Sequence, residues 1–103
     1  MILFINIKQK DLYNLLIKIP KNRITTYKIL AKKLRTSPRA IGKMLNANKY
    51  PEKYPCYKVV MNDGRIGGYS SSIKEKIKLL RKDGIEVRNG KIEKFRQITC
   101  NKE

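Results

Sequence analysis

One cysteine in this chain has neighbours that could make it a nucleophile. Cys56 lies in the run Tyr-Pro-Cys-Tyr-Lys-Val-Val, which covers residues 54–60. A thiolate attacks carbon readily, and the thioether that it forms is stable. A free cysteine is also a common small buried hydrophobe, so its surroundings have to decide between the two readings. The chain has no histidine, which excludes the usual Cys-His pair.

The second cysteine has no comparable setting. Cys100 lies in a polar tail with no motif around it, and we treat it as incidental. Two cysteines without histidine are too few for a disulfide scaffold or a zinc site. We expect no metal and no cofactor.

The charge of the chain points to nucleic acid. Its 103 residues include 25 Lys and Arg against 8 Asp and Glu, which gives a net charge of +17. Such a field suits a phosphate backbone. An anionic membrane surface, an acidic protein partner and lysine-rich usage without a partner are the alternatives.

Length and hydropathy limit the architecture. We expect one domain over residues 1–103 with no N-terminal companion, because a chain of this size buries a single core. The apolar runs are too short to span a membrane, and the N-terminus lacks the pattern of an export signal. A cytoplasmic monomer is the expectation.

The elements that would position Cys56 begin with helices. We expect a β-like lead-in over residues 1–7 and a helix over 12–19. Thr25 or Thr26 could cap a second helix ending near Arg35, and Ser37 followed by proline could open a third helix over 39–46. Two short helices and a tight turn in a basic chain indicate a helix-turn-helix.

The second half of the chain predicts hairpins and one more helix. A loop over 46–55 leads to a hairpin of 58–61 with 65–66, a wing beside the helices. A capping box at Ser72 opens a helix that Gly84 ends, and a hairpin of 85–87 with 91–95 follows. The predicted fold is α+β, a winged helix-turn-helix-like single domain, mainly helical with short β-hairpins.

Five motifs in register resemble one family. They are the Cys56 run, Gly67-Gly68-Tyr69-Ser70, Thr25-Thr26-Tyr27 with Leu30-Ala31, Arg39-Ala40-Ile41-Gly42, and Asn48. Their order over residues 11–84 resembles the O6-alkylguanine-DNA alkyltransferases. A chance match to one motif is common, whereas a match to five in order is specific.

The resemblance implies a role for the third predicted helix. In that family it lies in the minor groove of duplex DNA, where Ala40 and Gly42 would permit close approach, with Lys43 beside them. Arg39 would fill the gap left by the flipped nucleotide. Asn48 would hold the cysteine loop, the segment over residues 46–55 that leads to Cys56, beside this helix.

The resemblance also implies a chemical step. Cys56 would accept the alkyl group of O6-alkylguanine in a single irreversible turnover, and Tyr27 would donate its hydroxyl to the ring nitrogen of the base. The base pocket would be completed by a set of lid and wall residues: Gly68, Tyr69, Ser70 and the backbone carbonyls of Cys56 and Val59.

The proton relay departs from the family pattern. The histidine that follows the cysteine is replaced by Tyr57, and the glutamate that holds it by Asp83. A phenol, with a pKa of about 10, is a poor base for a thiol of about 8.5. Asp83 could polarise Tyr57 or a water, or the thiolate could be favoured by Lys58 and the positive field or by a helix N-terminus. We expect transfer that is slower and that rises with pH.

Two other functions stay open. The related alkyltransferase-like proteins flip and bind lesions without transfer, although they usually lack the cysteine that this chain keeps. A winged-helix regulator, in which Cys56 only packs, is the third reading.

Overall fold

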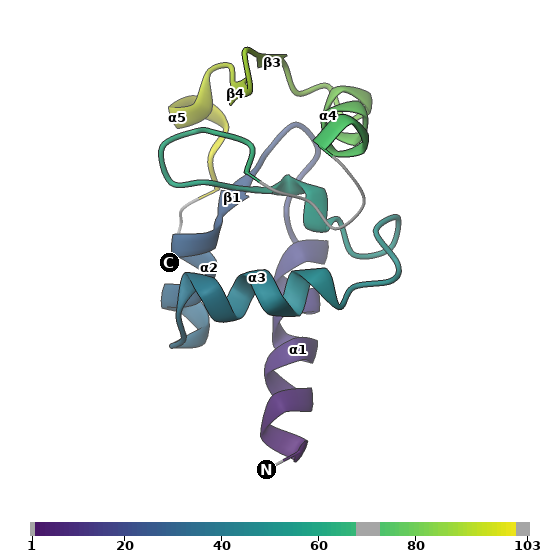
Figure 1. The fold of residues 1–103 in the computed structure, drawn as a ribbon, viewed down its shortest axis with the longest axis vertical. Coiled ribbons are helices and arrows are strands. Elements are labelled where there is room, and N and C mark those ends of the chain that lie inside the picture. The colour runs from purple at the N-terminus through teal and green to yellow at the C-terminus, as the bar shows by residue number, and fades with distance from the viewer. Residues whose placement is uncertain (1, 68–72, 101–103) are drawn as a thin grey trace.

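Three helices form one half of the molecule, and the later elements form the other (Figure 1). The computed structural model describes residues 2–67 and 73–100, with the side chains of residues 2–8 left out. The helices of the first half are α1 (Ile2–Ile17), α2 (Tyr27–Leu34) and α3 (Pro38–Asn46). None of the described helices has both the length and the hydropathy needed to cross a membrane.

The later elements are short. They are the 3-10 helix η1 (Cys56–Lys58), β2 (Val59–Val60), α4 (Ile73–Lys82), β3 (Val87–Arg88), β4 (Lys91–Ile92) and α5 (Phe95–Ile98). β1 (Thr25–Thr26) pairs in parallel with β2, so that Thr25 lies beside Val59. The crossover between these two strands consists of α2, α3 and the cysteine loop.

Local caps explain where α2 and α3 begin. Thr26 Oγ1 accepts a hydrogen bond from Ile29 N at 3.1 Å, and Ser37 Oγ accepts one from Ala40 N at 3.1 Å. Pro38 occupies the first position of α3, where no N–H is needed. Arg35, with φ at 55°, ends α2 in the left-handed region. The predicted helix-turn-helix is confirmed by these elements.

β2 lies between two hydrophobic cores. Val59 packs with Leu12, Leu30 and Ile41, while Val60 packs with the group around Leu80 on the other side. Successive side chains of a strand point to opposite faces, so Val59 packs into one core and Val60 into the other. Cys56, one turn before this strand, belongs to the first core.

Three sequence-based expectations need correction. Residues 1–7 do not lead in as a strand, because α1 already covers Ile2–Ile17; a helix satisfies its own hydrogen bonds, whereas a strand there would need a partner edge. The predicted helix over 12–19 corresponds to the last part of α1, which ends at Ile17. The predicted hairpin of 58–61 with 65–66 is not formed as a pair of strands. Met61 N donates to Arg65 O across the turn, but β2 pairs with β1 and Arg65 forms its β-bridge with Lys91.

The other hairpin is confirmed, and one element was missed. β3 and β4 pair in antiparallel register around Asn89 and Gly90, both with positive φ. The α+β, mainly helical fold agrees with the prediction. The short helix α5 was not predicted, and it returns the chain to β1, where Ile24 N bonds Ile98 O at 3.0 Å.

Candidate active site and nucleic-acid interface

Cys56 opens η1 at the junction between the cysteine loop and β2. Its side chain belongs to the first core, and the residue is 4% exposed. The preceding Pro55 has φ at −73°, which suits the fixed ring of proline. The proline ring therefore restricts the backbone immediately before Cys56.

A buried lysine lies near Cys56. Lys76, on α4, is 0% exposed, and its Nζ donates to Val59 O at 2.8 Å. The same ammonium lies 5.8 Å from the centre of the Tyr27 ring, which favours a cation–π contact. Burial lowers the pKa of Lys76 to about 8, and the negative charge of Cys56 opposes that fall. Lys76 thus brings a positive charge into the core that contains Cys56.

Tyr27 faces this cluster from the first turn of α2. Burial raises the pKa of its phenol, and the nearby charge of Cys56 raises that pKa further. The phenol therefore keeps its proton well beyond neutral pH. Gly67 lies against the ring: an added Cβ there would be 3.6 Å from Tyr27 Cε2 and 3.1 Å from Met61 Cγ.

Tyr57 lies beside Cys56 and shares a cavity with Asp83. The two residues line an open cavity of about 530 Å³ together with Glu52, Leu79 and Lys82. Burial raises the pKa of the Tyr57 phenol, with further contributions from the charges of Asp83 and Cys56. A phenol with a raised pKa stays protonated at neutral pH and cannot accept the proton of a thiol there.

Asp83 is bound to a different partner than the sequence suggests. Its Oδ2 lies 2.9 Å from Lys58 Nζ and accepts the Asn22 N–H at 2.9 Å. Lys58 Nζ also donates to Pro20 O at 2.9 Å. The Lys58 side chain is 4% exposed, so this is a buried ion pair. This ion pair and its two hydrogen bonds connect the end of α4, η1 and the turn after α1.

The predicted DNA-contacting residues lie together on α3. Arg39 and Lys43 are exposed, while Ala40 and Gly42 are half-buried. A Cβ added to Gly42 would meet nothing within 4 Å. The chain's own packing therefore does not require glycine at this position.

Asn48 connects α3 to the cysteine loop. It is buried, its Nδ2 donates to Tyr54 O at 2.8 Å, and its Oδ1 accepts from Tyr50 N at 3.0 Å. The Tyr54 ring also stacks on Tyr13 of α1, with centroids 4.2 Å apart and planes 10° apart. The loop is thus held two residues before Cys56.

The base-pocket residues divide into described and undescribed ones. Val59 is buried, and its carbonyl already accepts a bond from Lys76, which leaves one lone pair for another donor. Gly68, Tyr69 and Ser70 lie outside the described residues.

Sequence reasoning missed Lys76, although its position carried a signal. Lys76 lies three residues after Ile73 and four before Leu80, which places it on the apolar side of α4. A lysine on a buried helix face is exceptional unless it has a partner.

Comparisons with known proteins identify the family of this chain. The model of the family described as 6-O-methylguanine DNA methyltransferase, DNA binding domain, matches residues 8–85. The chain belongs to this family. Among its relatives, a bifunctional methyltransferase/endonuclease of Picrophilus torridus is 52% identical over 84 residues, which are 80% of this chain and 28% of that protein.

Two solved structures show the same fold. The O6-methylguanine-DNA methyltransferase of Pyrococcus kodakaraensis is 45% identical, with a TM-score of 0.68 over 74% of this chain and 45% of that chain. Atl1 of S. pombe, solved with damaged DNA containing O6-carboxymethylguanine, is 16% identical, with a TM-score of 0.81 over 94% of this chain and 97% of that chain. The chain spans less than half of the two longer relatives.

Proposed function

We propose that this domain binds duplex DNA through α3 and transfers the alkyl group of O6-alkylguanine to Cys56. The observation that carries the proposal is the grouping of Cys56, Tyr27 and Lys76, since it supplies a nucleophile, a hydrogen-bond donor and a positive charge in one place. Membership of the alkyltransferase family and the relatives' names support the reaction class.

The DNA step depends on the exposed surface of α3. Arg39 would fill the space of the flipped nucleotide, and Lys43 would contact the DNA beside it. Ala40 and Gly42 would let the minor groove approach the helix. Flipping is required because the O6 substituent of a stacked guanine cannot reach a buried sulfur.

The chemical step balances without a cofactor. The Cys56 thiol loses its proton to solvent, and its sulfur attacks the alkyl carbon. The bond between that carbon and O6 breaks, and its electron pair stays on the guanine. Tyr27 donates a hydrogen bond to the ring nitrogen and stabilises the negative charge of the leaving base, which then takes a proton from solvent and so balances the proton that the thiol released. The protein is consumed because the thioether is not cleaved.

Lys76 takes the place of the missing imidazole in this proposal. Its ammonium stabilises the thiolate by charge, in a site where burial strengthens the attraction. Tyr57 is a poor proton acceptor, and Asp83 is paired with Lys58, so neither serves as the relay. Of the three substitutes for the imidazole considered from sequence, we therefore favour a positive charge, supplied by Lys76 instead of Lys58.

The second candidate function is lesion binding without transfer. The likeness of fold to Atl1 favours it, since that protein was solved on DNA with an O6-alkylated base. Intact mass after incubation with a duplex containing O6-methylguanine distinguishes the two. One added methylene supports transfer, tight lesion-specific binding without added mass supports the sensor, and equal affinity for damaged and undamaged duplex without added mass contradicts both.

A further inference from the structure

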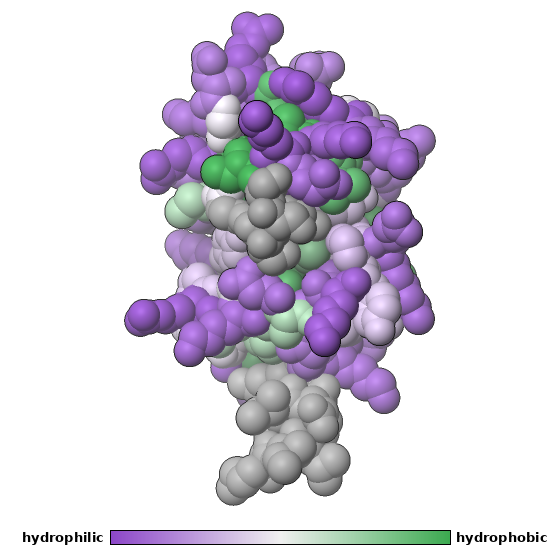
Figure 2. Space-filling model, turned by 45° about the vertical axis from the view of Figure 1, so that its right-hand side comes forward, coloured by the Kyte–Doolittle hydropathy of each residue, from purple (hydrophilic) through white to green (hydrophobic). Residues whose placement is uncertain are grey.

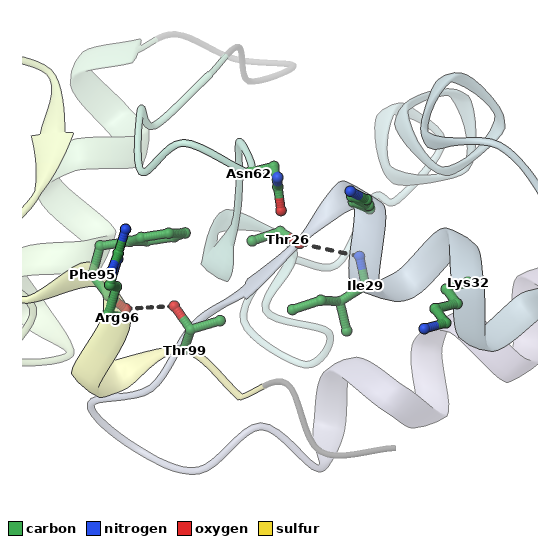
Figure 3. Close-up of a pocket in the computed structure, with 8 residues that line it drawn as sticks. Thr26, Ile29, Lys32, Asn62, Phe95, Arg96 and Thr99 are labelled. Carbon is green, nitrogen blue, oxygen red and sulfur yellow. Dashed lines mark hydrogen bonds between the residues drawn. The ribbon is translucent and has the colours of Figure 1, made fainter.

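A second basic site lies beside the proposed DNA interface. A cavity of about 460 Å³ opens between the start of α2, the turn after β2 and α5 (Figure 3). The family model ends at residue 85, so α5 lies outside the part of the chain that it matches. The cavity is therefore built partly from an element that the family match does not cover.

The charged side chains that line the cavity are all positive. Lys28 and Lys32 are one turn apart on α2, and Arg96 lies on α5 across from them. All three are exposed, and no ion pair among the described residues involves them. No aspartate or glutamate of the described chain lines the cavity. Three cations that line one cavity without a counter-ion favour an anionic ligand.

The polar groups of the cavity suit a phosphate oxygen. Thr26 caps α2 through Oγ1 and is 1% exposed, so it forms part of the cavity wall (Figure 3). The Asn62 side chain points toward Thr26 from the turn after β2 (Figure 3). An exposed amide beside an arginine and two lysines is a set of groups that often contacts DNA phosphates.

The site is held in place by contacts on each side of α5. Cys100 N donates to Ile24 O at 2.7 Å, and Arg23 Nη1 donates to Gln97 O at 3.0 Å. Phe95 packs against Gly64, where an added Cβ would lie 3.3 Å from Phe95 Cγ. Arg96 is thus presented from a fixed backbone beside β1.

We propose that Lys28, Lys32 and Arg96 bind a backbone phosphate of the duplex whose damaged base reaches Cys56. This inference rests on the proposed DNA binding and deepens it. The cavity borders Thr26, which immediately precedes Tyr27, so a strand entering the lesion site passes close to it. The face of the molecule shown in Figure 2 is mostly hydrophilic, with a few apolar residues exposed among the polar ones.

The test is the salt dependence of binding to an undamaged duplex. The slope of log K against log salt falls in magnitude by about 0.9 for each phosphate that the protein no longer neutralises. We expect this decrease in Arg96→Ala and in Lys32→Ala, while Arg96→Lys keeps most of the wild-type slope. Lys78→Ala, at an exposed lysine on α4, is the matched control and should change the slope far less.

Two outcomes would overturn the inference. One is an unchanged slope in Arg96→Ala and Lys32→Ala, or an equal fall in Lys78→Ala. The other is saturable binding of inorganic phosphate, abolished in Arg96→Ala, without any change in the DNA slope. Transfer from the free base O6-methylguanine needs no DNA contact and should be equal in wild type and Arg96→Ala. If wild type transfers no methyl group from a duplex that carries O6-methylguanine, the proposed reaction fails while the salt slope still tests this site.

Discussion

Lys58 Nζ lies 2.9 Å from Asp83 Oδ2, deep enough that the lysine side chain is 4% exposed. This ion pair engages the carboxylate that the family pattern would offer to the proton relay of the cysteine. Because Asp83 neutralises the charge of Lys58, the proposed mechanism assigns the positive charge beside Cys56 to Lys76.

Replacing the buried lysine should slow transfer strongly. Lys76→Met keeps most of the volume but removes the charge, and we expect the single-turnover rate at pH 7 to fall by about 100-fold, the equivalent of about 2.7 kcal/mol. Rapid-quench assays on a duplex with O6-methylguanine measure this rate, and circular dichroism controls for folding. A rate within threefold of wild type would show that Lys76 does not assist the cysteine.

The pH profile of transfer should have two limbs. The wild-type rate should rise from pH 6 as the thiolate forms and fall again once Lys76 loses its proton, near its pKa of about 8. Tyr27 stays protonated across this range because its pKa is raised. A rate that does not change between pH 6 and 9 is incompatible with this mechanism.

Stability should increase with pH through the same lysine. In the folded chain the pKa of Lys76 is about 8, against an ordinary value of 10.5, so the unfolded chain binds more protons between these values. The free energy of unfolding should therefore rise by about 2 kcal/mol between about pH 7 and about pH 10. Urea unfolding at several pH values measures this. Lys76→Met should flatten the curve, and an equal rise in that variant would point to other groups.

Tyr57 should contribute little as a base. Tyr57→Phe removes the hydroxyl, and we expect less than about a threefold change in the rate at pH 7, because the raised pKa of the phenol keeps it protonated. Parallel rate measurements on Lys76→Met give the comparison. A decrease in the rate of Tyr57→Phe as large as that of Lys76→Met would show that Tyr57 takes part in the proton transfer.

Gly42 should matter for DNA and not for folding. Gly42→Ala adds a methyl group into open space, and removing glycine from a helix interior stabilises by about 1 kcal/mol at most. We expect equal or higher stability with at least about tenfold weaker binding to duplex DNA, measured by fluorescence anisotropy. Asn14→Ala, at an exposed position of α1, is the control. Unchanged affinity of Gly42→Ala for duplex DNA would show that the DNA interface does not include this face of α3.

Local signals in the sequence predict the helix-turn-helix well. The caps at Thr26 and Ser37 and the turn at Asn89-Gly90 depend on neighbours within a few residues, so propensity and spacing suffice. Residues 1–7 are ambiguous because an apolar run that contains β-branched residues suits either a strand or a helix, and its partners decide. α5 gives no periodic signal, because it is four residues long.

Long-range contacts could not be predicted in the same way. Lys58 and Asp83 lie far apart in the sequence, and only the folded chain shows that they pair. The parallel pairing of Thr25 with Val59 likewise depends on how α2 and α3 pack. For Lys76, helical spacing places the side chain inward, but its contacts with Val59 and Tyr27 required the structure.

The most direct measurement is the mass of the peptide that contains Cys56 after reaction with a duplex carrying one O6-methylguanine. We predict one methyl group on Cys56, none on Cys100, and no gain in Cys56→Ser. An unmodified Cys56 after complete binding of the duplex, or a methyl group found on Cys100 instead, would contradict the proposed transfer.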